Sequence, residues 1–568
     1  MSDAEAVSSR ATDGRPDPAS VDAAVHGFAA ALVKLGANVA LRPWRALPAA
    51  ARLTADVAAA TARSTAMAVG LPARPVLEPA RRDRRFTDPA WQVHPFFFGT
   101  GQVYLAWARF LRDLVDAGDL DEVTAAKARF AVEALVDAAA PTNLLPTNPE
   151  ALRKAIGTRG ASVLAGLRNV VADLASNGKP SQVDRSAFRL GENLAATPGQ
   201  VVFRNDLMEL IQYAPQTETV YETPLLLSPP WINKYYIMDL APGRSFVEWA
   251  VRQGHTVFAI SYRNPDESMR GVALDDYLLR GLGAAVDVVR AITGQDQVNV
   301  AGLCVGGTLA VAHLAYLAHG DDRPVQSVTL LNTLVDFSRP GALGVFTDPA
   351  AVARVERAMA RRGYLDGPEM AATFDFLRAN DLIWSYVGRG WLMGEPPPAF
   401  DILAWNADST RVSAATHSQY LRSCYVENRL ATGRMTLGGR LLDLDQVEAD
   451  AYILAARDDH ITPWKASYAT TGLLPSRIRF VLSSSGHIAG IVNPPDGKRS
   501  YWTNDDLPED PEEWLAGASE HAGSWWGDWA EWMAARAGER RPPPPSPGSP
   551  EYPPISDAPG TYVRSETP

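Results

Sequence analysis

The sequence predicts an α/β fold, in which helices cover both faces of a mostly parallel sheet and a helical domain precedes it. Residues 86–195 carry apolar side chains at helical spacing and show no strand alternation. From Val220 onward, short apolar runs alternate with helical patterns, and this alternation is interrupted at residue 338 and resumes at Ala451. Buried strands that are apolar throughout and alternate with helices are typical of a parallel sheet covered on both faces.

The chain before residue 201 is predicted to be helical. Residues 1–84 are rich in alanine with scattered proline and arginine, which predicts loose helices on a partly disordered N-terminal arm. In residues 85–200, apolar side chains such as Tyr104, Trp107 and Leu111 recur three and four positions apart. That spacing lines one face of a helix, so we expect a helical N-terminal domain there.

Residues 201–540 are the predicted catalytic domain. Its expected strands are 223–228, 256–262, 298–303, 325–334, 451–456 and 478–482. Its expected helices are 275–293, 305–317 and a stretch near 512–537. Residues 338–445, rich in Arg, Pro, Trp and Phe and without a regular period, predict a cap inserted over the sheet. The proline-rich residues 541–568 predict a tail with polyproline character.

Composition narrows the class of protein. The formal net charge is -11, from 54 basic and 65 acidic residues, which argues against a nucleic-acid partner. The two cysteines, Cys304 and Cys424, cannot supply a secreted disulfide framework, so a reducing cytoplasm is expected. The N-terminus lacks a secretion signal pattern, and no apolar run reaches the about 20 residues of a transmembrane span.

The sharpest local signal is the segment 302–307, Gly-Leu-Cys-Val-Gly-Gly. It has the form of a nucleophile elbow, a tight turn from strand to helix, with Cys304 where esterases carry serine. The flanking glycines are needed because a side chain would collide in so tight a turn. The helix that begins at Val305 favours the thiolate over the thiol at its N-terminus.

A cysteine elbow in this fold needs a histidine base and an acid that orients it, in the chain order nucleophile, acid, histidine. His487 follows the predicted strand 478–482, and active sites of parallel sheets form at such strand ends. The acid should follow strand 451–456, where Asp458 and Asp459 are equally placed. Of the other histidines downstream of the elbow, His313, His319 and His460 are interpreted as structural, while His417 and His521 are assigned no role.

Several segments resemble the signatures of polyhydroxyalkanoate synthases, over about residues 85–535. They are 147–150, 230–236, 302–307, 459–464, 486–490 and 523–526. The resemblance implies an α/β-hydrolase fold with Cys304 as nucleophile, His487 as base and Asp459 as acid, since the family's acid precedes His-Ile-x-Pro-Trp. The oxyanion should be held by the backbone N–H of Val305 and by one from the loop after strand 223–228, at Ile232 or Trp231.

The resemblance is to the class I type, the poly(3-hydroxybutyrate) polymerases, although Leu303 stands where an aromatic residue is most frequent. It implies polymerisation of short-chain (R)-3-hydroxyacyl-CoA, such as 3-hydroxybutyryl-CoA, through a cysteine-bound acyl-enzyme. No cofactor or metal is expected. CoA counts as part of the substrate, because it is the leaving group. The implied partners are the growing polyester, the surface of cytoplasmic polymer granules and a second copy of the chain as a homodimer.

Two other functions fit parts of the sequence. A thioesterase or other hydrolase could use the same scaffold, and it would release free 3-hydroxy acid instead of insoluble polymer. A non-catalytic granule-associated protein could use the alanine-rich N-terminus and the tryptophans of 525–532 as anchors. Release of CoA would exclude that second alternative.

Overall fold

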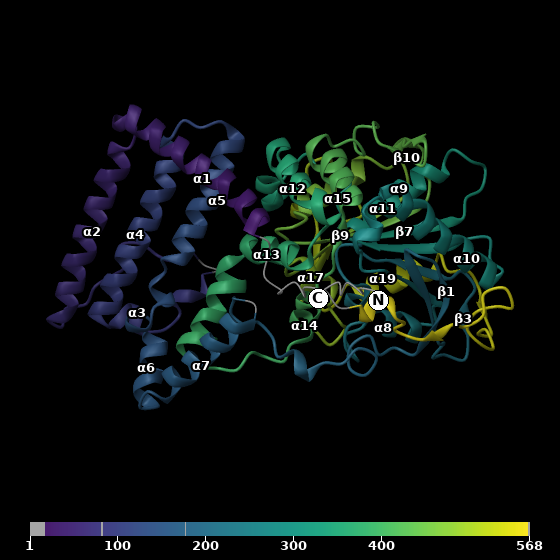
Figure 1. Ribbon diagram of the computed structural model, residues 1–568, viewed down its shortest axis with the longest axis horizontal. Coiled ribbons are helices and arrows are strands. Elements are labelled where there is room, and N and C mark those ends of the chain that lie inside the picture. The colour runs from purple at the N-terminus through teal and green to yellow at the C-terminus, as the bar shows by residue number, and fades with distance from the viewer. Residues whose placement is uncertain (1–17, 81–82, 177, 566–568) are drawn as a thin grey trace, which may run out of the picture. The chain divides into compact units, whose positions relative to one another are not determined.

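The chain divides into two units, and the computed structural model describes residues 18–80, 83–176 and 178–565 of it (Figure 1). The helical unit holds the described residues up to 184 together with 372–398. The catalytic unit holds 185–371 and the described residues from 399 on. Within the described ranges, no helix is both long and apolar enough to cross a membrane.

Among the described residues of the helical unit, the α-helices before residue 184 pack on one another. They are α1 Pro18–Leu41, α2 Leu47–Ala68, α3 Ala90–Val93, α4 Pro95–Ala117, α5 Glu122–Ala138, α6 Pro149–Gly157 and α7 Ala161–Ser176. Helix α2 packs on α4, and α1 packs on α5. Ala31 and Leu35 of α1 are buried in one core with Trp91, and Ala49 and Ala60 of α2 are also buried, so both helices are packed in the region predicted to be a loose arm.

Part of the predicted cap is held to the helical unit. In residues 372–398, the side chain of Asn169 on α7 donates to the carbonyl oxygen of Gly390 at 2.9 Å. The indole N–H of Trp391 donates to Asp173, also on α7, at 2.7 Å. The predicted cap is therefore divided between the two units, with residues 338–371 and 399–445 in the catalytic unit.

One sheet runs through the catalytic unit in the order β15-β14-β13-β12-β7-β6-β4-β5-β2-β1-β17. Its parallel centre is β4 Leu225–Ser228, β5 Val257–Tyr262, β6 Val298–Leu303, β7 Val325–Leu331, β12 Asp450–Ala456 and β13 Ile478–Ser483. Antiparallel strands flank it: β1 Gly199–Arg204, β2 Met208–Tyr213, β14 Ser500–Thr503, β15 Ser519–Ala522 and β17 Ser556–Asp557. The α/β prediction is confirmed, and the antiparallel strands were not predicted.

Helices connect these strands, and short two-stranded ribbons lie outside the main sheet. The helices are α8 Phe246–Arg252, α9 Leu274–Asp276, α10 Ala284–Thr293, α11 Val305–Leu317, α12 Pro349–Arg362, α13 Gly367–Leu377, α14 Asp401–Ala407, α15 Ala414–Tyr420, α16 Trp464–Tyr468, α17 His487–Ile491, α18 Pro511–Ala516 and α19 Trp526–Ala534. The ribbons pair β3 Val220–Tyr221 with β16 Arg540–Arg541, β8 Tyr364–Leu365 with β9 Val412–Ser413, and β10 Thr436–Leu437 with β11 Arg440–Leu441.

The single helix predicted near 512–537 is wrong. Strand β15 lies between α18 and α19, and Gly523, with a φ of +102°, turns the chain from the strand toward α19. Of the four tryptophans at 525, 526, 529 and 532, which the spacing favours as core or interface residues over an anchor, three lie in the core and Trp532 is half-buried. Trp525, Trp526 and Trp529 are at most 1% exposed and pack around Phe246.

The C-terminal segment is paired, although its proline content predicted a polyproline tail. Strand β16 pairs with β3, and β17 adds to the edge of the main sheet beside β1. The N–H of Ile555 also donates to the carbonyl oxygen of Val201 at 2.8 Å. Prolines are tolerated here because an edge strand needs hydrogen bonds on one side only.

Candidate active site

Cys304 lies at the turn between β6 and α11, as the elbow pattern predicted. Its φ of 51° and ψ of −121° put a non-glycine residue in a sparsely populated backbone region. The neighbouring strand holds this conformation, because the N–H of Cys304 donates to the carbonyl oxygen of Leu331 at 2.9 Å. Strain held in this way is characteristic of a nucleophile presented at the top of a sheet.

The glycines of the elbow are fixed by close backbone approaches. A Cβ at Gly302 would collide with the backbone of Gly307, and one at Gly306 would collide with the carbonyl oxygens of Ser228 and Pro229. The start of α11 therefore lies directly against the end of β4. A larger residue at either glycine would push the helix off the strand.

Two tyrosines interact with the thiol of Cys304, which is only 8% exposed as a residue. Tyr420 and Tyr425 both interact electrostatically with Cys304, and their rings lie 5.5 Å apart at right angles. Phe337 packs on both tyrosines, at 5.9 Å and 5.0 Å between ring centroids. The tyrosines come from the predicted cap region, but sequence reasoning did not single them out. The aromatic content of the predicted cap region was the one sequence signal that pointed toward them.

His487 and Asp459 form a buried pair. The Nδ1 of His487 lies 2.6 Å from Oδ2 of Asp459. Asp458 is exposed, so the structure places Asp459, not its neighbour, on the histidine. Since Nδ1 faces the carboxylate, Nε2 is the nitrogen left for Cys304, whose thiol interacts electrostatically with the imidazole.

Asp459 is held by the loop that follows it. Its Oδ1 accepts the backbone N–H groups of Ile461 at 2.8 Å and Thr462 at 2.9 Å. The Thr462 hydroxyl donates to Oδ2 at 2.7 Å and lies 3.2 Å from Nδ1 of His487. Sequence reasoning did not identify Thr462, although it stands inside the 459–464 segment. The carboxylate can therefore turn little, which fixes the plane of the imidazole.

In this pair, each side chain stabilises the charged form of the other. Burial by itself would lower the pKa of His487, but the Asp459 carboxylate, its hydrogen bond and the interaction with Cys304 raise this pKa to about 10. Burial would raise the pKa of Asp459, yet the imidazole and the Thr462 hydrogen bonds keep it below the ordinary value. The structure thus favours an imidazolium beside a carboxylate at neutral pH.

Asn332 fixes the backbone that carries His487. Asn332 follows β7 with a φ of 45°, and its side-chain amide donates to the carbonyl oxygen of His487. Its own N–H donates to the carbonyl oxygen of Leu454 on β12 at 2.8 Å. Nothing in the sequence pattern marked this residue, because its role depends on a partner 155 positions away.

The predicted oxyanion donors lie at the ends of adjacent strands. Val305 is the first residue of α11, and the first N–H groups of a helix have no partner within the helix. Trp231 and Ile232 follow β4, which pairs with β6 in register, Ser228 opposite Gly302. Trp231 is buried and packs on Tyr420 with ring centroids 5.6 Å apart. Both predicted sources of donors therefore lie at the same end of the sheet as the thiol.

Three other histidines, His313, His417 and His521, lie in surroundings different from those of this pair. His313 and His417 are buried, and burial lowers the pKa of each to about 4. His521 lies on β15, where its Nε2 is 2.8 Å from the hydroxyl oxygen of Thr503. In the part of the chain that the structure describes, no group of three or more His, Cys, Asp or Glu could hold a metal ion.

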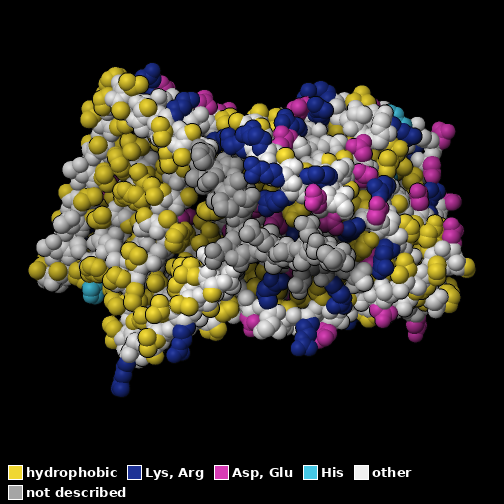
Figure 2. Space-filling model, viewed as in Figure 1, with side chains coloured by type: hydrophobic (Ala, Val, Ile, Leu, Met, Phe, Trp, Pro, Cys, Tyr) yellow, Lys and Arg dark blue, Asp and Glu magenta, His cyan; other side chains and the backbone are white. Residues whose placement is uncertain are grey.

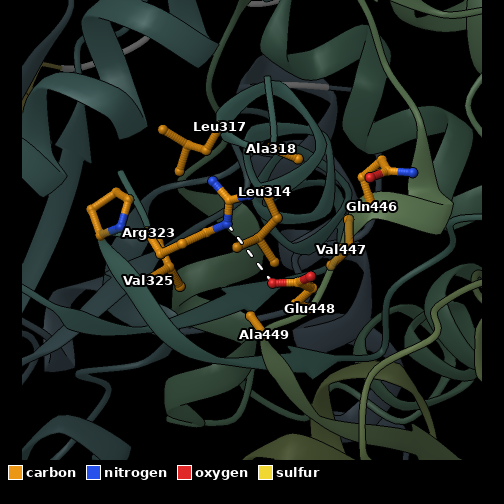
Figure 3. Close-up of a pocket in the computed structure, with 10 residues that line it drawn as sticks. Leu314, Leu317, Ala318, Arg323, Val325, Gln446, Val447, Glu448 and Ala449 are labelled. Atoms are coloured by element: carbon orange, nitrogen blue, oxygen red, sulfur yellow. Dashed lines mark ion pairs between the residues drawn. The ribbon is translucent and has the colours of Figure 1, made fainter. Parts of the chain in front are cut away.

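A small pocket elsewhere in the catalytic unit is not part of this site (Figure 3). It is lined by the end of α11 and by the residues at the start of β7 and before β12. Arg323 and Glu448 face each other there at 4.0 Å. The pocket is at the amino ends of the parallel strands, whereas Cys304, Asp459 and His487 follow their carboxyl ends.

Comparisons with known proteins identify related families of this chain. A family model described as "Poly-beta-hydroxybutyrate polymerase (PhaC) N-terminus" matches residues 82–250, and the model of the alpha/beta hydrolase fold matches residues 242–494. The second match confirms the predicted α/β-hydrolase fold.

Curated relatives match most of the chain. "Poly(3-hydroxyalkanoate) polymerase subunit PhaC" of Cupriavidus necator is 48% identical over 492 residues, which are 85% of this chain and 83% of the relative. "Poly(3-hydroxyalkanoate) polymerase" of Methylorubrum extorquens is 44% identical over 528 residues, 92% of this chain and 87% of the relative. "Poly(3-hydroxyalkanoate) polymerase 2" of Ectopseudomonas oleovorans is 42% identical over 490 residues, 86% of this chain and 87% of the relative.

Proposed function

Because the chain belongs to the poly(3-hydroxyalkanoate) polymerase family, we propose that it joins short-chain (R)-3-hydroxyacyl groups from their CoA thioesters into polyester, with Cys304 as nucleophile. The observation that carries this proposal is the strained thiol at the elbow beside the buried His487–Asp459 pair. A thiol nucleophile exchanges one thioester for another, so the acyl group stays activated for transfer.

In the first step, the Cys304 thiolate attacks the thioester carbonyl carbon. The oxyanion is held by the N–H of Val305 and by that of Trp231 or Ile232. The bond from carbon to the CoA sulfur then breaks, and CoA leaves with the proton that His487 has carried. This step leaves the acyl group on Cys304.

In the second step, the 3-hydroxyl of another acyl group attacks the acyl carbon on Cys304. His487 accepts the hydroxyl proton, a carbon–oxygen ester bond forms and the bond to the cysteine sulfur breaks. The proton stays on His487 beside the released thiolate, which restores the pair that began the first step. Asp459 stabilises the imidazolium that forms in each cycle.

The test is a balance of products from (R)-3-hydroxybutyryl-CoA. Free CoA is measured with a thiol reagent, while insoluble polyester and free 3-hydroxybutyrate are measured separately. We expect CoA and ester units to appear in equal amounts. Release of CoA with only free 3-hydroxybutyrate would show a hydrolase instead. Parallel assays with longer 3-hydroxyacyl-CoA substrates test the proposed chain length.

Asp459→Asn should keep the fold but slow chain elongation by about 10³-fold, because the neutral amide cannot stabilise the imidazolium and favours the wrong tautomer of His487. The amide oxygen can still accept the N–H groups of Ile461 and Thr462. Acylation should persist, because the elbow helps to form the thiolate but not to activate the attacking hydroxyl. We expect a rapid burst of about one CoA per enzyme followed by a slow phase. Elongation at the wild-type rate would contradict this role.

The aromatic cover over Cys304 should make the resting thiol slow to alkylate. Tyr420 and Tyr425 interact with the thiol, Phe337 packs on both tyrosines, and Cys304 itself is buried. Water must be kept from the acyl-enzyme, while the polyester needs an exit. We expect a bulky maleimide to label Cys304 slowly, and the rate to change when a non-transferable acyl-CoA analogue binds. Mass spectrometry of the Cys304 peptide measures the rate. Fast labelling that the analogue leaves unchanged would exclude a movable cover.

The helical unit offers a surface for the polyester granule. Figure 2 shows apolar side chains gathered over its helices. Leu164, Leu167, Val171 and Leu174 are 52–62% exposed and lie on one stripe of α7. Exposed apolar stripes of this kind mark binding surfaces, and the hydrophobic polymer is a matching partner. Changing the four residues to serine should reduce the fraction of enzyme that sediments with purified polyester particles.

A further inference from the structure

The C-terminal segment and the loop after β4 meet at the ammonium group of Lys234. Its Nζ lies 2.7 Å from Oδ1 of Asp408 and donates to the carbonyl oxygen of Ser565 at 3.2 Å. The Lys234 side chain is only 4% exposed. A charge taken so far from water is costly unless a fixed partner compensates it, so the position of this lysine depends on both contacts.

The C-terminal segment 556–565 is anchored to the sheet before it reaches Lys234. Glu209 on β2 is fully buried, and its carboxylate accepts the N–H groups of Thr561 at 2.9 Å and Tyr562 at 3.0 Å. Gly560 has a φ of +80°, and a Cβ there would collide with that carboxylate. The turn therefore requires glycine, and it directs the chain toward Ser565.

The loop after β4, which carries Lys234, also makes hydrogen bonds to the residues around Asp408. The indole N–H of Trp405 donates to the carbonyl oxygen of Lys234 at 2.8 Å. The hydroxyl of Tyr236 donates to Oδ2 of Asp408 at 2.9 Å, and Asn233 pairs with Ser409 in an isolated bridge. The backbone just after Trp231 and Ile232 is thus clamped between the residues around Asp408 and the C-terminal segment.

We propose that Lys234 is a positioning residue, which together with Asp408 and the C-terminal segment 556–565 fixes the loop so that the N–H of Trp231 or Ile232 points at the oxyanion. The inference rests on the proposed function and extends it to a segment outside the elbow and the His487–Asp459 pair. Donors that are already aimed where charge develops stabilise the transition state without reorganisation. A loosened loop would lose this effect while the thiol and its histidine stay intact.

The main test is the double variant Lys234→Met/Asp408→Asn, which removes both charges and leaves none unpaired. The matched control is Lys34→Met, because the Lys34–Asp121 pair has the same 2.7 Å distance but is 53% and 55% exposed. We expect kcat for CoA release to fall by about 10²-fold in the double variant, with KM, the thermal midpoint and the rate of Cys304 alkylation by iodoacetamide unchanged. The control should match the wild type in every measurement.

A second variant, Gly560→Val, displaces the C-terminal segment without changing Lys234. It should lower kcat by a similar factor and again leave alkylation unchanged. Wild-type kcat in either folded variant would overturn the proposal, and so would a parallel loss of alkylation, since the residues would then support the whole site. If the wild-type enzyme releases CoA without polymer, the proposed function fails, while a fall in kcat of these variants still reports on the oxyanion loop.

Discussion

Replacing Cys304 by alanine should reduce CoA release from (R)-3-hydroxybutyryl-CoA by about 10⁴-fold or more and abolish polymer. The acyl group would have no sulfur to bind, and water does not replace it in a site as buried as that of Cys304. The fold should be kept because alanine has the same Cβ as cysteine in the strained elbow. Thermal unfolding checks the fold, and CoA release with polymer yield checks the activity.

Serine at position 304 tests two properties of sulfur, its ready ionisation and the activated thioester that it forms. Cys304→Ser should also be severely impaired, because an alkoxide is harder to generate and its ester is less activated than a thioester. A serine variant that releases CoA and free acid would show that the scaffold can act as a hydrolase. Wild-type turnover of the alanine variant would remove Cys304 from the mechanism.

The other cysteine provides the control. Cys424 is fully buried, and burial raises the pKa of its thiol to about 12, so it is not a competent nucleophile at neutral pH. Cys424→Ala should therefore retain activity close to that of the wild type. A loss as large as that of the Cys304 variant would show that the wrong thiol was assigned.

Replacing His487 by glutamine should slow acylation by about 10³-fold or more, since no other group beside Cys304 in the structure is placed to carry the thiol proton. With a pKa of about 10, His487 holds its proton throughout the neutral range and can pair with the Cys304 thiolate. Glutamine keeps a similar volume but can neither hold that positive charge nor return the proton to CoA. Single-turnover release of CoA measures this step.

The pH dependence of Cys304 alkylation gives an independent check. In the wild type, the rate should stay flat across neutral pH, because His487 keeps its proton below its raised pKa and pairs with the thiolate. In His487→Gln, the rate should be lower at neutral pH and rise with pH, because the thiol must then ionise without a paired cation. Identical profiles for the two proteins would contradict a pairing between the thiolate and the imidazolium.

The parallel centre of the sheet was predictable because its strands are buried on both faces. Strand 298–303 and helix 305–317 were placed at their observed ends, and each of the other predicted strands overlaps an observed one. The antiparallel strands β1 and β2 were missed. Glu209 and Gln212 interrupt the apolar character of β2, and their hydrogen-bond partners at Thr561 and Gly548 lie far along the chain.

Among the predicted site residues, too, some follow from local sequence and others depend on distant contacts. A strand, a glycine-flanked cysteine and a helix point to Cys304 within six residues, because all the constraints on the elbow are local. The choice between Asp458 and Asp459 could not be made from their spacing, and only the resemblance favoured Asp459. In the structure, Asp458 is exposed and Asp459 meets His487, because the N–H groups of residues 461 and 462 turn its carboxylate inward.

The sequence by itself determined the class of fold, the nucleophile turn and the strand ends from which the acid and base come, since apolar runs and glycines act on their immediate neighbours. Only the tertiary structure decided the contacts between segments far apart in the chain. Examples are the bond from Asn332 to His487, the tyrosines around the thiol, and the hold of the C-terminal segment on Lys234. A hydrogen bond or a buried ion pair needs a partner at a fixed distance, and no local pattern encodes which distant residue supplies it.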